Sequence, residues 1–253
     1  MLAVYLEAPF AAFRNFTAGW YRPSAGFIPP TAAYGLLLNF AGIDSRLREE
    51  EPDHSSKVPA SLLRKGLPPC RLAIGAIVDH RSKHDKTEPQ EAGCFPAVQT
   101  IYQQLHNYPV GTSGGDREKS AHGNKYNITP VRRELLVGLK AVLVIEANAE
   151  FENRIRKGCL GETDQTHYGI PFVGDNSFMI DRFDLLPRIP SAFWFERVLP
   201  DQQGEVFRTS RLTMHIDRED SSKTRSELFA PCSTASPLIP ASAWVSFGED
   251  SWN

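Results

Sequence analysis

The chain has 253 residues, of which 41% are hydrophobic and 23% are charged. These values are typical of a globular protein with a full core in one principal domain, with or without an appendage. Its longest apolar runs are too short to cross a bilayer, and its first residues lack the basic lead of a secretory signal, so we expect a cytoplasmic protein without membrane contact. Four widely spaced cysteines predict neither a zinc ribbon nor a disulfide framework. We expect no cofactor and no metal.

The formal net charge of −2 argues against the strongly basic surface that is typical of proteins binding nucleic acid on their own. The charges are unevenly distributed, because residues 81–133 contain eight lysines and arginines against five acidic residues. Such a distribution is compatible with a protein that grips a few nucleotides within a larger complex, but gives no positive support for one.

Hydrophobic periodicity and turn residues predict six regular elements. The helix that starts at Pro30 has a favourable proline in its first turn and Thr31 as a possible cap, and Gly158 is expected to end the second helix. Together the elements predict an α+β fold with a ferredoxin-like (RRM-like) β-α-β-β-α-β order and both helices on one face of the sheet. In chain order they are a strand at 2–7, a helix at 30–43, strands at 71–79 and 135–146, a helix at 149–157 and a strand at 178–185.

A long interruption, residues 80–130, separates the second and third predicted strands. Within it, residues 95–106 have helical periodicity, and residues 111–121 are rich in glycine and typical of a flexible loop. A structureless loop of this length is unusual inside a compact domain unless it has a function. Two alternatives follow: a projecting functional insertion, or a loop that is disordered in its glycine-rich part.

After the last predicted strand the pattern changes to short strands separated by polar turns, at 192–198 and 211–217. We expect residues 1–187 to form the main domain and residues 188–253 to form a small C-terminal β-rich subdomain. An exposed aromatic patch there would mark a partner surface.

Three blocks of the sequence carry a resemblance: residues 6–43, 126–137 and 158–185. The opening block reads LEAPFAAFRNFTAGWYRPSAGFIPPTAAYGLLLNFAGI. Taken in order, the three blocks resemble the CRISPR-associated family-five proteins, which are Cascade subunits of the repeat-associated RNA-binding superfamily and hold the 5′ end of the guide RNA. The opening block is similar to the branch found in myxobacterial and cyanobacterial type I-B systems.

The resemblance implies an RNA-binding subunit of a type I surveillance complex that caps the 5′ handle of the guide. It implies that the interruption, about 80–130, is a thumb that presses on the guide. It further implies contacts with the first backbone subunit and with the large subunit, and proximity to target DNA near the flanking motif.

In the opening block the resemblance points to Arg14, Asn15, Tyr21 and Arg22 in the loop after the first strand. Splayed bases stack on aromatic and guanidinium planes, while cations hold phosphates. The alternative is that Trp20 and Tyr21 cover the core and that Arg22 is a solvated charge. Two residues of the first helical turn are further candidates: Thr31 and Tyr34.

The block in which the thumb returns to the sheet places three cations and an aromatic ring close together, namely Lys125, Tyr126, Arg132 and Arg133. Strand alternation predicts that Arg132 and Arg133 point to opposite faces, so that one reaches RNA while the other pairs with an acid. The alternative is a solvated sheet edge.

The glycine-rich block implies a loop in which the main chain approaches the RNA backbone, since glycine permits unusual φ angles. The alternative is a set of turns joining the second helix to the next strand. The candidate residues are Gly158, Gly161, His167, Tyr168 and Gly169.

A different function class is a metal-independent endoribonuclease, for which His122, Lys125 and Tyr126 are suitable acid–base groups. A third is a protein-interaction module without RNA. His80 and His84 lie four residues apart, but in a polar segment without a clear third metal ligand. We expect a non-catalytic protein.

Overall fold

The computed structural model describes residues 1–14, 20–46, 66–77, 94–109, 126–163, 169–199, 208–217 and 220–248. Side chains are described throughout these ranges except at 104–109, 126–130 and 221.

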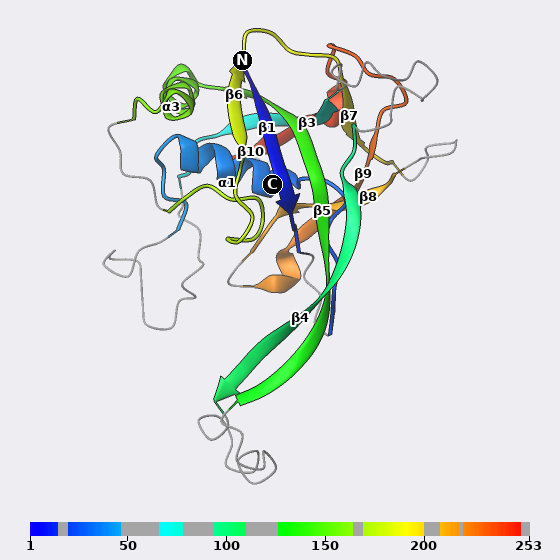
Figure 1. Ribbon diagram of the computed structural model, residues 1–253. Coiled ribbons are helices and arrows are strands. Elements are labelled where there is room, and N and C mark those ends of the chain that lie inside the picture. The colour runs from blue at the N-terminus through cyan, green and yellow to red at the C-terminus, as the bar shows by residue number, and fades with distance from the viewer. Residues whose placement is uncertain are drawn as a thin grey trace.

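The described part of the chain is a mixed α+β structure in which two α-helices accompany a mostly antiparallel sheet (Figure 1). No described helix is long and apolar enough to cross a lipid bilayer. The strands are β1 Leu2–Ala11, β2 Tyr21–Arg22, β3 Cys70–Ile77, β4 Ala97–Pro109, β5 Tyr126–Ala147, β6 Arg182–Leu186, β7 Ala192–Arg197, β8 Ser210–His215, β9 Arg225–Pro231 and β10 Val245–Phe247. The α-helices are α1 Pro30–Phe40 and α3 Ala149–Leu160, and two short 3-10 turns are η1 Ser221–Lys223 and η2 Ala241–Ala243.

The sheet has the strand order β6-β1-β5-β3-β7-β9-β8, and every neighbouring pair on this path is antiparallel. Its first four strands and the two α-helices follow one another along the chain as β1, α1, β3, β5, α3 and β6. These six elements occur in the predicted order, with β2 between β1 and α1 and β4 between β3 and β5. The C-terminal strands continue the sheet, because β7 and β10 pair with successive parts of the same edge of β3.

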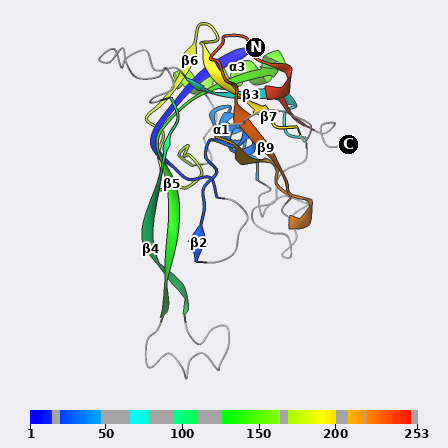
Figure 2. The same cartoon turned by 90° about the vertical axis from the view of Figure 1, so that its right-hand side faces the viewer.

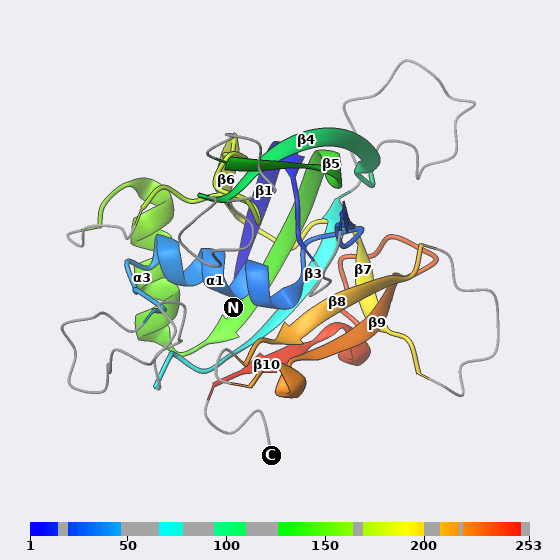
Figure 3. The same ribbon diagram turned by 90° about the horizontal axis from the view of Figure 1, so that it is seen from below.

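The two helices lie on one face of the sheet and pack against one another (Figure 3). Alternate residues of β1 point into the core on this side, as the period of two in a strand requires. On the other face Trp194 of β7 is fully buried against Ala73 and Val142, and its indole N–H donates a hydrogen bond of 2.8 Å to the carbonyl of Ser236. The C-terminal segment thus covers the face that the helices leave open.

Helix α3 does not end at Gly158, contrary to the prediction. It continues to Leu160 and ends at Gly161, whose φ of +72° gives the left-handed conformation typical of a helix C-terminus. Gly158 is instead buried inside the helix, where an added Cβ would lie 1.7 Å from the carbonyl oxygen of Phe40. The glycine is needed for close packing of α3 on α1.

Helix α1 begins at Pro30, as predicted, but Thr31 does not cap it. Its N-cap is Pro29, which makes no side-chain capping hydrogen bond. The hydroxyl of Thr31 instead donates to the carbonyl of Thr213 in β8 at 3.0 Å. Thr31 therefore links the helix to the sheet.

A two-stranded arm projects from the body (Figures 1 and 2). We call β4 together with residues 126–137 of β5 the arm. Strand β5 runs from the arm into the body, and its partner on one edge changes from β4 at Val137 to β3 at Ala141. Gly138 lies at this change with a φ of +73°. The sequence resemblance predicts a thumb at about residues 80–130, a range that includes β4 and the first residues of β5.

The helix predicted at residues 95–106 is wrong, because Ala97–Pro109 form strand β4. Each residue of β4 from Ala97 to His106 is paired with a residue of β5. Val98 and Ile101 are exposed to solvent on the arm. The strand predicted at 178–185 is confirmed only in its second half, where β6 begins at Arg182.

We predict that Gly158→Ala lowers the free energy of unfolding by about 3 kcal/mol, the upper end for an overpacked core, because the clashing atom belongs to the backbone. Urea unfolding followed by circular dichroism measures this change. Gly35→Ala is the matched control, since Gly35 is exposed in α1 and a Cβ there meets nothing within 4 Å. Alanine should stabilise that helix by about 0.5–1 kcal/mol. Equal effects of the two substitutions would contradict the close packing at Gly158.

Candidate nucleic-acid interface at the base of the arm

Strand β5 is paired on both edges where the arm leaves the body (Figure 2). The partner of Arg132 is Tyr102 in β4 on one side and Tyr21 in β2 on the other. Directly paired residues point to the same face of a sheet. The three side chains therefore form a row across three strands, which we call the aromatic row: Tyr102, Arg132 and Tyr21.

The two tyrosines of the aromatic row are open to solvent, and Arg132 lies half-buried between them. Tyr102 is 76% exposed and Tyr21 is 39% exposed, and the Arg132 guanidinium carbon lies 5.6 Å from the centre of the Tyr21 ring. Trp20, which is 62% exposed, lies beside Tyr21, and its carbonyl accepts a 2.7 Å hydrogen bond from the Arg132 N–H. The alternative that Trp20 and Tyr21 cover the core is wrong.

Glu134 holds the end of β2 in place. Its carboxylate accepts a short hydrogen bond from the Tyr21 hydroxyl and a 3.0 Å hydrogen bond from the Ser24 N–H. The hydrogen bond to Glu134 raises the pKa of Tyr21 above its ordinary value, so the ring carries a neutral phenol at physiological pH. Its open face is suited to stacking rather than to acid–base work.

The opposite face of β5 carries a buried ionic cluster. Arg133 is only 5% exposed, and its Nη2 lies 2.5 Å from Oδ2 of Asp175. The same oxygen lies 2.9 Å from Nη2 of Arg14, and Arg133 also donates to Gln103 at 3.3 Å. We call Arg14, Arg133 and Asp175 the arginine–aspartate cluster. The prediction that Arg132 and Arg133 point to opposite faces, with one of them paired to an acid, is confirmed.

Asp175 is held by its own turn. The Ser177 N–H donates a 3.0 Å hydrogen bond to Oδ1 of Asp175. Burial alone would raise the pKa of Asp175, but this hydrogen bond and the Arg133 guanidinium outweigh burial and hold the pKa below its ordinary value. Asp175 is therefore ionised at neutral pH.

The turn itself is fixed against the end of β1. The Ala12 N–H donates a 3.2 Å hydrogen bond to the carbonyl of Val173. Gly174 adopts a φ of +81°, and a Cβ there would lie 2.1 Å from the Ala12 carbonyl oxygen. Only glycine fits at this position, so the turn brings Asp175 to one defined place below Arg133.

The remaining predicted residues are dispersed. Tyr34 is buried in the core, stacked on Phe247 at 4.5 Å, and donates a 2.7 Å hydrogen bond to the carbonyl of Pro68. Thr31 and Gly158 contribute to the packing of α1 described above. Tyr34, Thr31 and Gly158 therefore lie outside the arm base, by which we mean the aromatic row together with the arginine–aspartate cluster, Arg22 and Glu134. Arg22 is half-buried beside Arg133 and has no ion-pair partner among the described residues.

Gly161 and Gly169 lie in exposed turns with positive φ. The carbonyl of Gly169 accepts a 3.4 Å hydrogen bond from Asn39 of α1, which places this turn beside the helix. Several predicted residues lie outside the described part of the chain: Asn15, Lys125, His167, Tyr168, and the side chain of Tyr126. His80, His84 and His122 lie outside it as well.

Sequence reasoning missed Tyr102, Glu134 and Asp175. Tyr102 was assigned to a helix, and only the pairing of β4 with β5 places it beside Arg132. Asp175 lies in the sequence Gly-Asp-Asn-Ser, which signals a turn, but nothing in that signal names its partner 42 residues away.

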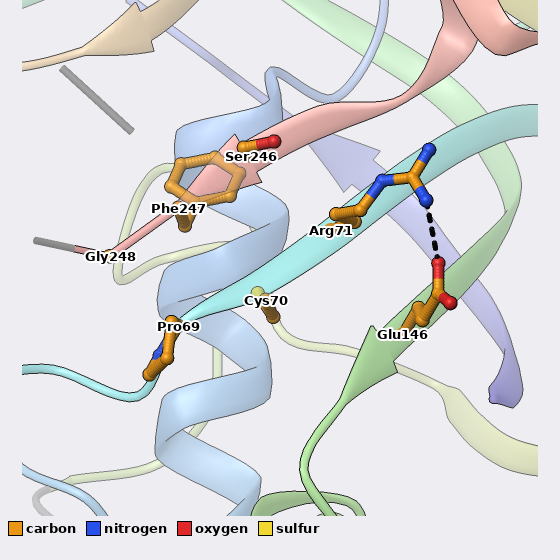
Figure 4. A pocket seen from close by; sticks show the side chains of 7 residues that line it. All are labelled: Pro69, Cys70, Arg71, Glu146, Ser246, Phe247 and Gly248. Atoms are coloured by element: carbon orange, nitrogen blue, oxygen red, sulfur yellow. Dashed lines mark hydrogen bonds and ion pairs between the residues drawn. The ribbon is translucent and has the colours of Figure 1, made fainter. Parts of the chain in front are cut away.

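A pocket of about 560 Å³ lies far from the arm, where β3 begins (Figure 4). Within it Arg71 and Glu146 form a 2.9 Å ion pair, and the Arg71 guanidinium lies 4.9 Å from the centre of the Trp244 ring. No predicted RNA-binding residue lines the pocket, and its two charged groups pair with each other. Its lining residues are Pro69, Cys70, Arg71, Glu146, Ser246, Phe247 and Gly248.

We predict that Asp175→Asn lowers the free energy of unfolding by about 3 kcal/mol at neutral pH, because it leaves the Arg133 charge buried without a counter-ion. The native pKa of Asp175 is depressed, so its contribution is fully present above the unfolded pKa of about 4 and is lost as the pH falls through the lower native pKa. The difference between wild type and variant should therefore shrink in acid.

Urea unfolding at several pH values measures this difference. Asp184→Asn is the matched control, because Asp184 pairs with Arg182 at a partly exposed site and should contribute less than about 1 kcal/mol. A variant of Asp175 as stable as wild type at neutral pH would refute the role of this pair.

No protein-family model matches this chain, and no curated protein matches it in sequence. The chain is similar in structure to a chain of a solved CRISPR RNA-guided surveillance complex, with a TM-score of 0.48 and 10% sequence identity. The alignment covers 99% of this chain and 95% of that chain.

Proposed function

We propose that this chain is a non-catalytic RNA-binding subunit of a type I CRISPR surveillance complex, and that it holds the 5′ handle of the guide RNA at the base of the arm. The aromatic row is the observation that carries the proposal. Unpaired bases stack on exposed aromatic rings and guanidinium planes, and such contacts do not require a particular base. Exposed tyrosines on both sides of an arginine offer such a surface.

The charge of the arm base supports the same function. Four arginines (Arg14, Arg22, Arg132 and Arg133) gather there against two carboxylates, Glu134 and Asp175. Arg132 makes no ion pair with any other described residue, so its charge is available to a phosphate. This local surplus explains how a chain with a net charge of −2 binds a short stretch of nucleic acid.

The topology also supports the proposal. The order β1, α1, β3, β5, α3, β6, with the strands arranged as β6-β1-β5-β3, is compatible with a ferredoxin-like unit that carries the arm as its thumb. The sequence resemblance implies that the nucleic acid is guide RNA and that the partners are the first backbone subunit and the large subunit. Exposed apolar residues of the arm, including Val98 and Ile101, are suited to contact the backbone subunit.

The primary test incubates the purified chain with labelled single-stranded repeat RNA in EDTA and scores gel shift and cleavage together. The proposal expects binding without cleavage. Site-specific cleavage in EDTA would refute the non-catalytic role and favour the endoribonuclease. Absence of binding, both alone and with neighbouring subunits present, would refute RNA binding.

We predict that Tyr102→Ala weakens binding of this RNA about tenfold, because one base loses its stacking partner. Tyr102→Phe is the control, since it keeps the ring and should retain the affinity. Fluorescence anisotropy with labelled RNA measures both. Equal weakening by the two substitutions would show that the hydroxyl, rather than the ring, is responsible.

We also predict that Arg132→Gln lowers the salt dependence of binding, by a slope of about 0.7 for one phosphate contact on a single strand. The measurement is affinity as a function of salt concentration. Arg71→Gln is the matched control, because Arg71 also lies over an aromatic ring, Trp244, but far from the arm. An unchanged slope in the Arg132 variant would exclude a phosphate contact by that residue.

A further inference from the structure

The arginine–aspartate cluster contains one arginine that faces outward. The Arg14 side chain is 45% exposed, whereas those of Arg133 and Asp175 are 6% and 10% exposed. Arg133 is thus the inner member, which neutralises the carboxylate from within the protein. Arg14 is the outer member, and it is held by the same carboxylate oxygen at 2.9 Å.

The ion pair with Asp175 does not use all the N–H donors of Arg14. A guanidinium has five N–H donors, and Arg14 donates only through Nη2 to a described side chain. Two guanidinium groups around one carboxylate leave a net positive charge, so the outward donors of Arg14 are suited to an anion.

Asp175 is rigidly placed, so it fixes the guanidinium that it binds. Its turn is fixed by the hydrogen bond from the Ser177 N–H, by the close contact of Gly174 with the Ala12 carbonyl and by the ion pair with Arg133. A free arginine side chain would lose conformational entropy on binding a phosphate, whereas a pre-oriented one loses less.

Arg14 also lies close in the chain to the aromatic row. Its backbone is bridged to Ser24, which follows β2 and donates its N–H to Glu134. Glu134 in turn accepts from Tyr21 of the row. One short piece of chain therefore carries both the stacking ring and the outward guanidinium, which lie on opposite faces of β5 beside the short strand β2.

We propose that Asp175 is a positioning residue that orients Arg14 to bind a phosphate of the single-stranded nucleic acid held at the arm base. This inference rests on the proposed function. It gives an acidic residue, which would by itself repel phosphate, a role in binding it.

A double-mutant cycle tests the inference, with the whole chain and a fluorescein-labelled oligouridylate as probe. Arg14→Ala should weaken binding about tenfold, as expected for one lost charge-assisted contact. Asp175→Asn should weaken it about fivefold, because Arg14 becomes mobile. In the Arg14→Ala background, Asp175→Asn should cause no further loss.

Each other outcome has a defined meaning. If Asp175 merely repels phosphate, Asp175→Asn tightens binding in both backgrounds, and the inference is overturned. If Asp175 acts only through overall stability, the losses add, and the inference is again overturned. Failure of the wild-type chain to bind any single-stranded RNA, both alone and with neighbouring subunits present, would instead refute the proposed function, and this inference with it.

A second background keeps the test decisive if the Asp175→Asn variant does not fold. Should Asp175→Asn fail to fold, the same cycle is measured in an Arg133→Met background, where no buried guanidinium is left without a partner. Asp175 still binds Arg14 there, so non-additivity between Arg14→Ala and Asp175→Asn remains the expected result.

Discussion

Strand β5 is continuous from the arm to the body, and the positions of the site residues depend on its register. In the body β5 lies between β1 and β3, and in the arm it lies between β4 and β2. Side chains alternate along the arm part of β5, so its pairing with β4 and β2 decides which arginine faces which side. A shift of one residue in one direction would put Val131 in the place of Arg132, and the aromatic row would lose its cation. A shift in the other direction would put Glu134 in the place of Arg133, so that a carboxylate instead of an arginine would face Asp175.

A buried guanidinium is tolerated only with a counter-ion, and this requirement joins the arm base to the turn that carries Asp175. Arg133 cannot occupy its site unless the turn is in place. That turn depends on the close fit of Gly174 against Ala12 at the end of β1. Three segments that are distant in sequence therefore become ordered together. The outward Arg14 is oriented by the same arrangement.

Sequence alone predicted the elements that bury apolar residues on a regular period, such as α1 and the body part of β5. It did not predict β4, because its apolar residues are exposed and its partner is distant in the chain, so periodicity carried no information about burial. The end of α3 depended on a choice between Gly158 and Gly161, which packing against Phe40 decides. At the site, alternation predicted the opposite orientations of Arg132 and Arg133. The identity of the acid required the tertiary fold.

The chemistry of the arm base has a consequence for what it can recognise. Stacking rings and guanidinium groups bind the planes and phosphates that all nucleotides share, so they fix the path of a strand more than its sequence. The net charge of −2 restricts binding further, since exposed charges farther apart than about 8–10 Å are screened at physiological salt. Under the proposed function, a locally positive arm base on a chain of slightly negative charge attracts a strand at one place. We infer that this surface sets the position and direction of the RNA, and that any preference for particular bases comes from other contacts.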